Sequence, residues 1–255
     1  MATIELNNPD PDVLDGRHIR ASAFEAAQRE LLTRLHQQLP AADPQFATAL
    51  AVGAGYSRLP QLMLDVGYHV TAVDPSADAT RALRAGYNGR WPTLRSVVGD
   101  AKYLPAEADS IDLVWCVDTL EIVSDVRPVF TEISRVLRPG GVVILDTLNN
   151  TALSRVIYLR LFQQAPGTRI MPPGRYTAAR LWRPDDLSAA ARAAGLRVAE
   201  VIGYEPRSPI ALLSALLRRR SGRIGDEQLS DLAGFRLSTS EHTPPVTYYA
   251  IARAE

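Results

Sequence analysis

Two glycines and a carboxylate in the first third of the chain have types and spacing suited to binding a nucleotide. Gly53 and Gly55 close one apolar run, and Asp74 closes the next. Glycines let the backbone turn sharply and let a ligand approach without an intervening side chain. An acid at the end of the neighbouring strand can accept hydrogen bonds from both ribose hydroxyls of an adenosine. The spacing therefore predicts an adenosine site.

Each feature also has a simpler interpretation. A Gly-x-Gly can be an ordinary strand-to-helix turn, and Asp74 can equally be the N-cap of the following helix. Dinucleotide-binding enzymes show the same two features, but their fingerprint G-x-G-x-x-G requires a third glycine. That position is Arg58, which would crowd a pyrophosphate. The sequence therefore disfavours an oxidoreductase that uses NAD.

A regular alternation of strands and helices must position these residues. Short apolar runs bounded by turn residues predict buried strands, and amphipathic segments between them predict helices. Strands that are apolar on both faces and are separated by helices are typical of a parallel sheet covered on both sides. We expect an α/β, doubly wound, mostly parallel Rossmann-like sheet, with strands at 47–55, 69–74, 94–100, 110–117 and 142–148, and helices at 24–39, 57–67, 76–86 and 126–137.

After residue 150 the alternation is interrupted by helical insertions after the fifth strand and before the last. We expect a single domain over 1–255, and insertions on a rigid scaffold commonly shape a substrate pocket. The parts would be an N-terminal helical lid (1–44), a cofactor-binding core (45–150) and substrate-side insertions (151–182 and 204–242). The elements expected here are helices at 151–164, 183–195 and 208–220, a loop at 165–177, and strands at 196–205 and 246–254.

Further motifs follow at the ends of the later strands. They are Val98-Gly99-Asp100-Ala101, the run SIDLVWCV (110–117) and the run RVLRPGGVVIL (135–145). In this order and at these spacings, residues 45–150 resemble the class I S-adenosylmethionine-dependent methyltransferases. The resemblance implies S-adenosylmethionine as cofactor and S-adenosylhomocysteine as product.

The resemblance also implies roles for individual cofactor-binding residues. Ala51 stands where the family usually has an acid, and Ser57 stands where it usually has a third glycine. Both departures weaken the expected grip on the methionine end, and leave open either a lower affinity or a compensating residue from the amino-terminal helix. The implied residues are Gly53, Ala54 and Gly55 at the methionine part, Asp74 at the ribose, Pro75, Asp100 and Ala101 at the adenine, and Cys116 and Val117 beneath the sulfonium.

A narrower resemblance concerns the run CVDTLEIV (116–123), followed by DTLN (146–149). These runs resemble the ubiquinone-biosynthesis O-methyltransferases, which methylate phenolic hydroxyls and commonly carry an acid, two residues, then Glu-His. Here Asp118 and Glu121 are present, but the histidine is Ile122. Two carboxylates could still hold Mg²⁺ with waters. With one ligand missing, Mg²⁺ is not favoured and we predict no metal site; Glu121 alone is also explained as a helix-start acid.

Methyl transfer needs little acid–base machinery, because a sulfonium methyl is already activated and alignment does most of the work. A phenol is a poor nucleophile, so a nearby base would help. His242, just before the last strand, is our candidate base, with Asp118 and Glu121 as further catalytic candidates. The alternative for His242 is an exposed loop histidine.

The leading hypothesis is methyl transfer to a hydroxyl of a small aromatic, lipophilic, polyketide-like or quinone-like acceptor, as in secondary metabolism. The alternatives are N- or C-methylation of a small metabolite, and S-adenosylmethionine binding with a non-methylating reaction. Ala51, Ser57 and Ile122 keep the last alternative open.

The composition of the chain limits the classes of molecule that we expect it to bind. Lys+Arg 28 balances Asp+Glu 28, which gives no general attraction to nucleic acid. A single cysteine, Cys116, excludes internal disulfides, and the amino terminus lacks a secretory pattern. We expect a cytoplasmic enzyme that acts on a small molecule, without nucleic acid or stable membrane insertion; a homodimer is left open.

Overall fold

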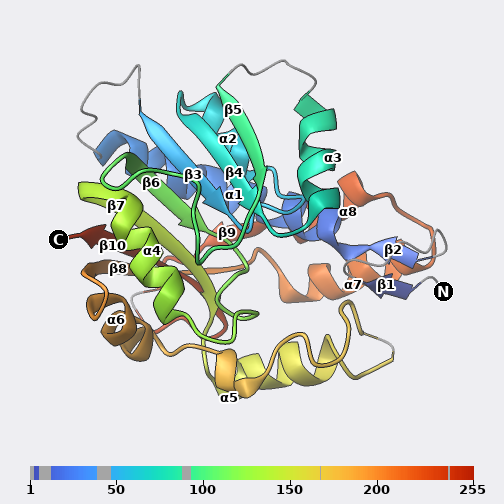
Figure 1. The fold of residues 1–255 in the computed structure, drawn as a ribbon. Coiled ribbons are helices and arrows are strands. Elements are labelled where there is room, and N and C mark those ends of the chain that lie inside the picture. The colour runs from blue at the N-terminus through green and yellow to red at the C-terminus, as the bar shows by residue number, and fades with distance from the viewer. Residues whose placement is uncertain (1–2, 6–12, 39–46, 88–92, 167, 241) are drawn as a thin grey trace.

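The computed structural model of the 255-residue chain describes residues 3–5, 13–38, 47–87, 93–166, 168–240 and 242–255. Its centre is an eight-stranded sheet in the order β5-β4-β3-β6-β7-β10-β8-β9 (Figure 1). The first five in that order are mutually parallel, and β10 runs antiparallel to both β7 and β8. The mostly parallel Rossmann-like sheet is therefore confirmed. The strands are β3 (Thr48–Val52), β4 (His69–Asp74), β5 (Leu94–Val98), β6 (Ile111–Cys116), β7 (Leu137–Leu148), β8 (Leu196–Pro206), β9 (Phe235–Leu237) and β10 (Thr247–Ala254).

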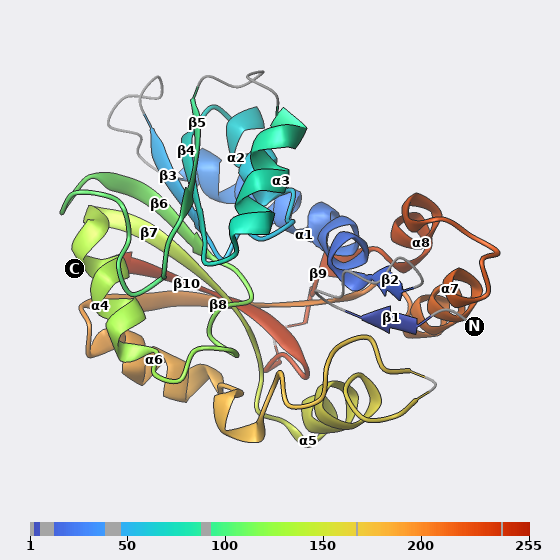
Figure 2. The same cartoon turned by 45° about the vertical axis from the view of Figure 1, so that its right-hand side comes forward.

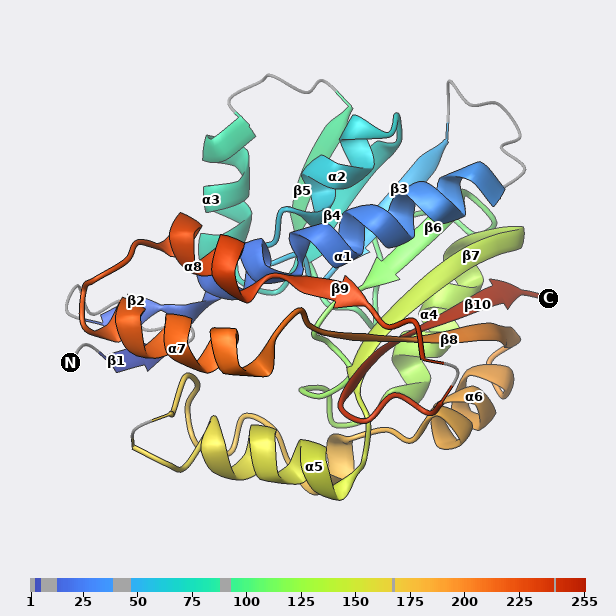
Figure 3. The ribbon, with the colours of Figure 1, turned by 180° about the vertical axis from the view of Figure 1, so that it is seen from behind.

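Helices cover both faces of this sheet, as the two-sided apolar strands require. In β3, Ala49 and Ala51 face one core and Leu50 and Val52 face the other. The first core is covered by α1 (Gly16–Gln38), α2 (Leu59–Asp65) and α3 (Ala77–Tyr87), and the second by α4 (Arg127–Val136) and α6 (Pro184–Arg192). In Figure 3, α1 lies across the sheet.

The amphipathic helix expected at 24–39 is present over its described residues. Phe24, Leu31, Leu32 and Leu35 are all buried against the sheet. The helix begins earlier than expected, at Gly16, and Leu39 lies outside the described residues. Among the described residues, no helix is long and apolar enough to cross a membrane.

The carboxyl-terminal half differs most from the sequence prediction. The expected helix at 151–164 is a short α5 (Ala152–Ser154) that continues as a π-helical turn, Arg155–Leu161. A 3-10 turn, Ala178–Arg180, and α7 (Pro209–Arg220) follow. Three further features were not expected from the sequence: α8 (Asp226–Ala233), the edge strand β9, and the small parallel pair β1 (Thr3–Glu5) and β2 (Val13–Asp15). Figure 2 shows α7 and α8 beside β1 and β2, away from α4 and α6.

An ion pair between a half-buried Glu132 and an exposed Arg135 holds the segment that follows β5. Glu132 of α4 accepts hydrogen bonds from the Leu104 backbone N–H (2.8 Å) and from Arg135 Nε (2.8 Å). Arg135 Nη2 in turn donates to the Ala106 carbonyl (2.9 Å). Hydrogen bonding to Arg135, with the Leu104 N–H adding to it, lowers the pKa of Glu132. The loop that carries Asp100 is thereby tied to α4.

We predict that Glu132→Gln destabilises the protein in a pH-dependent way. A carboxylate whose pKa is lowered by folding stabilises the native state above its unfolded pKa of about 4.3, and loses that contribution as pH falls through the folded pKa. The free energy of unfolding, measured with urea, should therefore differ most between wild type and variant above about pH 5, and the difference should shrink below about pH 4. Glu107→Gln removes an exposed carboxylate nearby and is the control. A difference that stays constant with pH would contradict this role.

Candidate active site

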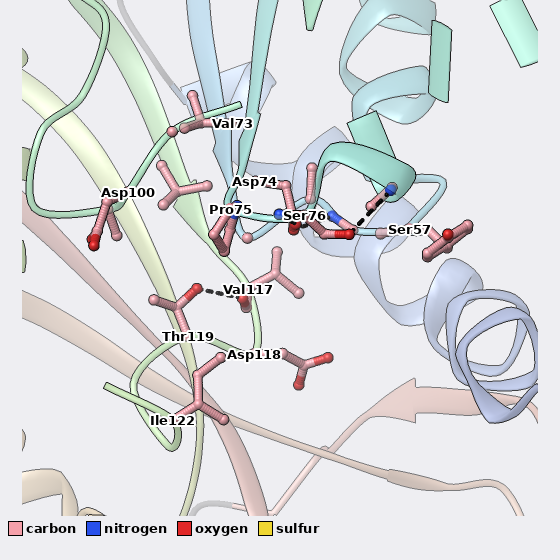
Figure 4. Close-up of a pocket in the computed structure, with 18 of the residues that line it drawn as sticks. Ser57, Val73, Asp74, Pro75, Ser76, Asp100, Val117, Asp118, Thr119 and Ile122 are labelled. Atoms are coloured by element: carbon pink, nitrogen blue, oxygen red, sulfur yellow. Dashed lines mark hydrogen bonds between the residues drawn. The ribbon is translucent and has the colours of Figure 1, made fainter. Parts of the chain in front are cut away.

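A cavity of about 370 Å³ opens where β3, β4, β5 and β6 end (Figure 4). Parallel strands bring their carboxyl ends to one edge, so four separate turns meet there. Figure 4 shows Asp118, Thr119 and Ile122 across the opening from Asp74, Pro75 and Ser76. The described residues that line it are 52–57, 73–76, 99–101 and 117–119, with Phe24, Gln28, Ala79, Ile122, Val123 and Arg175.

The carboxylate of Asp74 joins two of these turns. Its Oδ2 accepts the Gly55 backbone N–H at 2.8 Å, and its Oδ1 accepts the Ser76 backbone N–H at 2.8 Å. Each carboxylate oxygen has a second lone pair that these bonds leave unused. The helix cap is Ser76, whose Oγ accepts the Ala79 N–H at 3.2 Å. Asp74 is therefore not the N-cap that the sequence left open.

Gly53 and Gly55 both have positive φ, +71° and +51°, in the region that disfavours side chains. A Cβ on Gly53 would overlap Thr119 Oγ1 and the Val117 carbonyl oxygen. A Cβ on Gly55 would meet its nearest atom, Asp74 Oδ2, at an ordinary 3.6 Å. The glycine at 53 is thus required by the chain's own packing, whereas the sequence argument had assigned it to a ligand.

The adenine-side candidates also reach the cavity. Asp100 follows β5 with an exposed side chain, and its Oδ1 accepts the Lys102 backbone N–H at 2.9 Å. Ala101 is buried, and Pro75 follows Asp74 at the end of β4. With Gly53, Ala54, Gly55 and Asp74, all of these candidates line one cavity.

Cys116 and Val117 were expected to share the floor, but only Val117 lines the cavity. Successive residues of a strand face opposite sides. Val117 joins the core beneath α1 and α2, and Cys116 joins the core beneath α4. Burial, partly offset by a hydrogen bond with Thr119, raises the pKa of the Cys116 thiol to about 12. The thiol is therefore protonated and inert.

The three catalytic candidates are separated by the fold. Asp118 lines the cavity, with φ of +45°. Glu121 does not line it, and its side chain is 1% exposed. His242 does not line it either. It lies in an exposed turn, where its backbone N–H donates to Ser240 Oγ (3.2 Å). Pro244, bonded through its carbonyl to Asn149 Nδ2, faces inward instead.

Gln28 and Arg175 are polar lining residues that were not expected from the sequence. Gln28 comes from α1 and is 2% exposed, and its Oε1 has no hydrogen-bond donor among the described residues. Arg175 comes from the insertion after β7. The helical periodicity that placed Phe24 toward the core also places Gln28 there, one turn later, so that signal was present in the sequence. No pattern marked Arg175, because it lies in an irregular loop.

The described residues contain no group of three or more histidine, cysteine, aspartate or glutamate side chains that could hold a metal ion. Asp118 lines the cavity while Glu121 is buried away from it, and Ile122, which replaces the family's histidine, also lines the cavity.

Comparison with known proteins agrees with this geometry. A family model described as a methyltransferase domain matches residues 50–145. The ubiquinone biosynthesis O-methyltransferase of Xanthomonas axonopodis pv. citri is 31% identical to this chain, in a match that covers 68% of the chain and 73% of that protein. The ubiquinone biosynthesis O-methyltransferase of Thiobacillus denitrificans is 30% identical, in a match that covers 65% of the chain and 72% of that protein. The chain belongs to the class I S-adenosylmethionine-dependent methyltransferases.

S-adenosylmethionine is accordingly the cofactor of this methyltransferase. The Burkholderia thailandensis 1,6-didemethyltoxoflavin-N1-methyltransferase, solved with bound S-adenosylhomocysteine, has the same fold. The TM-score is 0.51 at 18% identity, and the match covers 94% of this chain and 79% of that one.

The two positions at which the sequence departs from the family pattern, Ala51 and Ser57, differ in their place in the structure. Ala51 is fully buried in the core and does not line the cavity, while Ser57 lines it and its Oγ accepts the Leu59 N–H at 3.0 Å.

We predict that Gly53→Ala destabilises the methyltransferase more than Gly55→Ala. Both variants incur the roughly 1–2 kcal/mol cost of a side chain at positive φ. Gly53→Ala adds the overlap with Thr119 and Val117, which we expect to cost about 1–3 kcal/mol more. Chemical denaturation of the two variants side by side measures the difference. If both variants lost the same free energy of unfolding, the packing of Val117 and Thr119 would not be what requires glycine at 53.

Proposed function

We propose that this methyltransferase transfers a methyl group to a hydroxyl of a small aromatic acceptor of the quinone or polyketide-like class. The observation that carries the proposal is a single cavity with Asp74 and Asp100 on one side and Asp118 on the other. We propose oxygen as the methylated atom because relatives at about 30% identity are named O-methyltransferases.

For the cofactor, we propose that the adenine lies against Pro75, Asp100 and Ala101. Asp74 would use its remaining lone pairs to accept the ribose hydroxyls, at no cost to its bonds with Gly55 and Ser76. The methionine part would lie against 53–55 and above Val117, with Cys116 supporting Val117 from the core.

The missing acid at Ala51 has a replacement in this proposal. An ammonium group on the methionine part needs an acceptor, and a buried amide oxygen without a donor is costly to leave unsatisfied. Gln28 Oε1 is such an atom in the lining. We assign it as the ammonium acceptor, supplied by the amino-terminal helix.

Asp118 is the only one of the three catalytic candidates that reaches the cavity. When bound, the cofactor supplies an electrophilic methyl group on a sulfonium. Transfer of that methyl group would form an oxygen–carbon bond and break the sulfur–carbon bond, and the acceptor hydroxyl would have to lose its proton. The carboxylate of Asp118 accepts that proton and releases it to solvent afterwards. Glu121 and His242 have no part in this step.

The proposal is tested by incubating the enzyme with methyl-labelled S-adenosylmethionine and three acceptor sets: catechols, aromatic amines and 1,3-dicarbonyl compounds. Mass spectrometry should find label on oxygen of the catechol set. Label confined to nitrogen or carbon would overturn the choice of oxygen. Tight cofactor binding without product in any set would favour a non-methylating reaction.

We predict that Asp118→Asn lowers kcat by about 10²-fold or more, because removal of a general base typically costs 10²–10⁴-fold. The affinity for S-adenosylhomocysteine, measured by calorimetry, should remain within about twofold of wild type. Asp109→Asn is the matched control, since Asp109 is an exposed aspartate that also has positive φ (53°) and lies outside the cavity. Equal kcat values for the two variants would remove Asp118 from the chemistry.

A further inference from the structure

The charges around the cavity are unequal. Three carboxylates line it, from Asp74, Asp100 and Asp118. Among the described lining residues, Arg175 is the one permanently positive side chain. The Nε of Arg175 is buried, so its N–H needs an acceptor, either from the protein or from a ligand.

The described part of the protein supplies no such acceptor. No ion pair or hydrogen bond joins the Arg175 guanidinium to any described residue, and its buried Nε has no acceptor. Its guanidinium carbon lies 5.8 Å from the centroid of the Tyr176 ring, a cation–π contact that leaves the in-plane donors available. A buried donor without an acceptor is costly, and a bidentate carboxylate would satisfy it.

The backbone next to Arg175 is held by a buried side chain. Gln163 is 2% exposed, its Nε2 donates to the Tyr176 carbonyl (3.1 Å), and its Oε1 accepts the Tyr176 N–H (2.8 Å). Tyr176 itself packs with Tyr158 and Met171 in a separate apolar cluster. The arginine therefore projects from a fixed backbone, which reduces the entropy lost on binding an anion.

The strand order indicates which ligand meets Arg175. Across the sheet the parallel strands run β5-β4-β3-β6-β7, so Asp100 after β5 and the insertion after β7 come from opposite ends of the row. The insertion is joined to the segment after β6 by Arg180, whose Nη1 donates to the Ile122 carbonyl (3.3 Å). Arg175 thus belongs to the side of the cavity where Asp118 and Ile122 lie, opposite the adenosine side.

We propose that Arg175 binds a carboxylate of the acceptor, so that the acceptor is an aromatic acid whose hydroxyl is directed toward Asp118. This inference rests on the proposed function, because it assigns a subsite of the same cavity. The other source of a carboxylate is the methionine part of the cofactor, and the experiment separates the two.

The test uses the enzyme saturated with S-adenosylhomocysteine and a panel of hydroxylated benzoates and cinnamates, each paired with its neutral carboxamide. Affinities are measured by calorimetry for wild type, Arg175→Gln and Arg160→Gln. Arg160 is an exposed arginine of the same insertion that does not line the cavity. We expect wild type to prefer acids, and Arg175→Gln to lose about tenfold or more in affinity for them while its weak affinity for the amides is unchanged. Arg160→Gln should match wild type.

Three results would overturn the inference. Acids and amides could bind wild type equally, or no acid could bind at all. Alternatively, Arg175→Gln could lower the affinity for S-adenosylhomocysteine by tenfold, while a cofactor analogue that lacks the carboxylate binds wild type and variant equally. That result would show that Arg175 binds the carboxylate of the cofactor. Failure of S-adenosylhomocysteine to bind wild type would instead refute the proposed function, so the two failures are distinguishable.

Discussion

The site depends on one carboxylate that bonds to two turns at once. Asp74 receives the N–H of Gly55 from the turn after β3 and the N–H of Ser76 from the turn after β4. Those two turns would otherwise carry unpaired donors at the open edge of the sheet. Because the bonds use one lone pair on each oxygen, the same side chain that shapes the crevice can also accept hydroxyl groups from a ligand. Structure and binding therefore share one residue.

A second constraint fixes the position of the cavity wall that carries Asp118, where we propose that the acceptor binds. The turn after β3 can approach the segment after β6 only because Gly53 has no Cβ, and Val117 and Thr119 occupy that space. Asp118 lies between them, so it is fixed relative to the glycine turn. The insertion after β7 is attached to the same segment through Arg180 and Ile122. The cavity is thus one packed unit from Asp100 to Arg175, although its residues come from five different segments and α1.

The parallel half of the fold was predictable because it follows from local patterns. The run 69–74 matches β4, and the helices expected at 76–86 and 183–195 begin at Ala77 and Pro184. The short β9 has three residues, too few for a periodic signal, and the pairing of Tyr204 with Leu237 is non-local. The π-helical turn at Arg155–Leu161 shows the same apolar spacing as an α-helix in sequence. The site residues divide in the same way. Strand order brought Asp74, Asp100 and Gly55 together, whereas the outward turn at His242 and the buried position of Glu121 are set by tertiary packing.

A crystal structure of the protein with S-adenosylhomocysteine bound tests most directly whether Asp74 holds the ribose while it joins the two turns. We expect both ribose hydroxyls within hydrogen-bond distance of Asp74, with the Asp74 bonds to Gly55 and Ser76 intact and the adenine beside Asp100. An adenosine bound elsewhere, or a crevice closed by side chains so that Asp74 contacts no ligand, would contradict it.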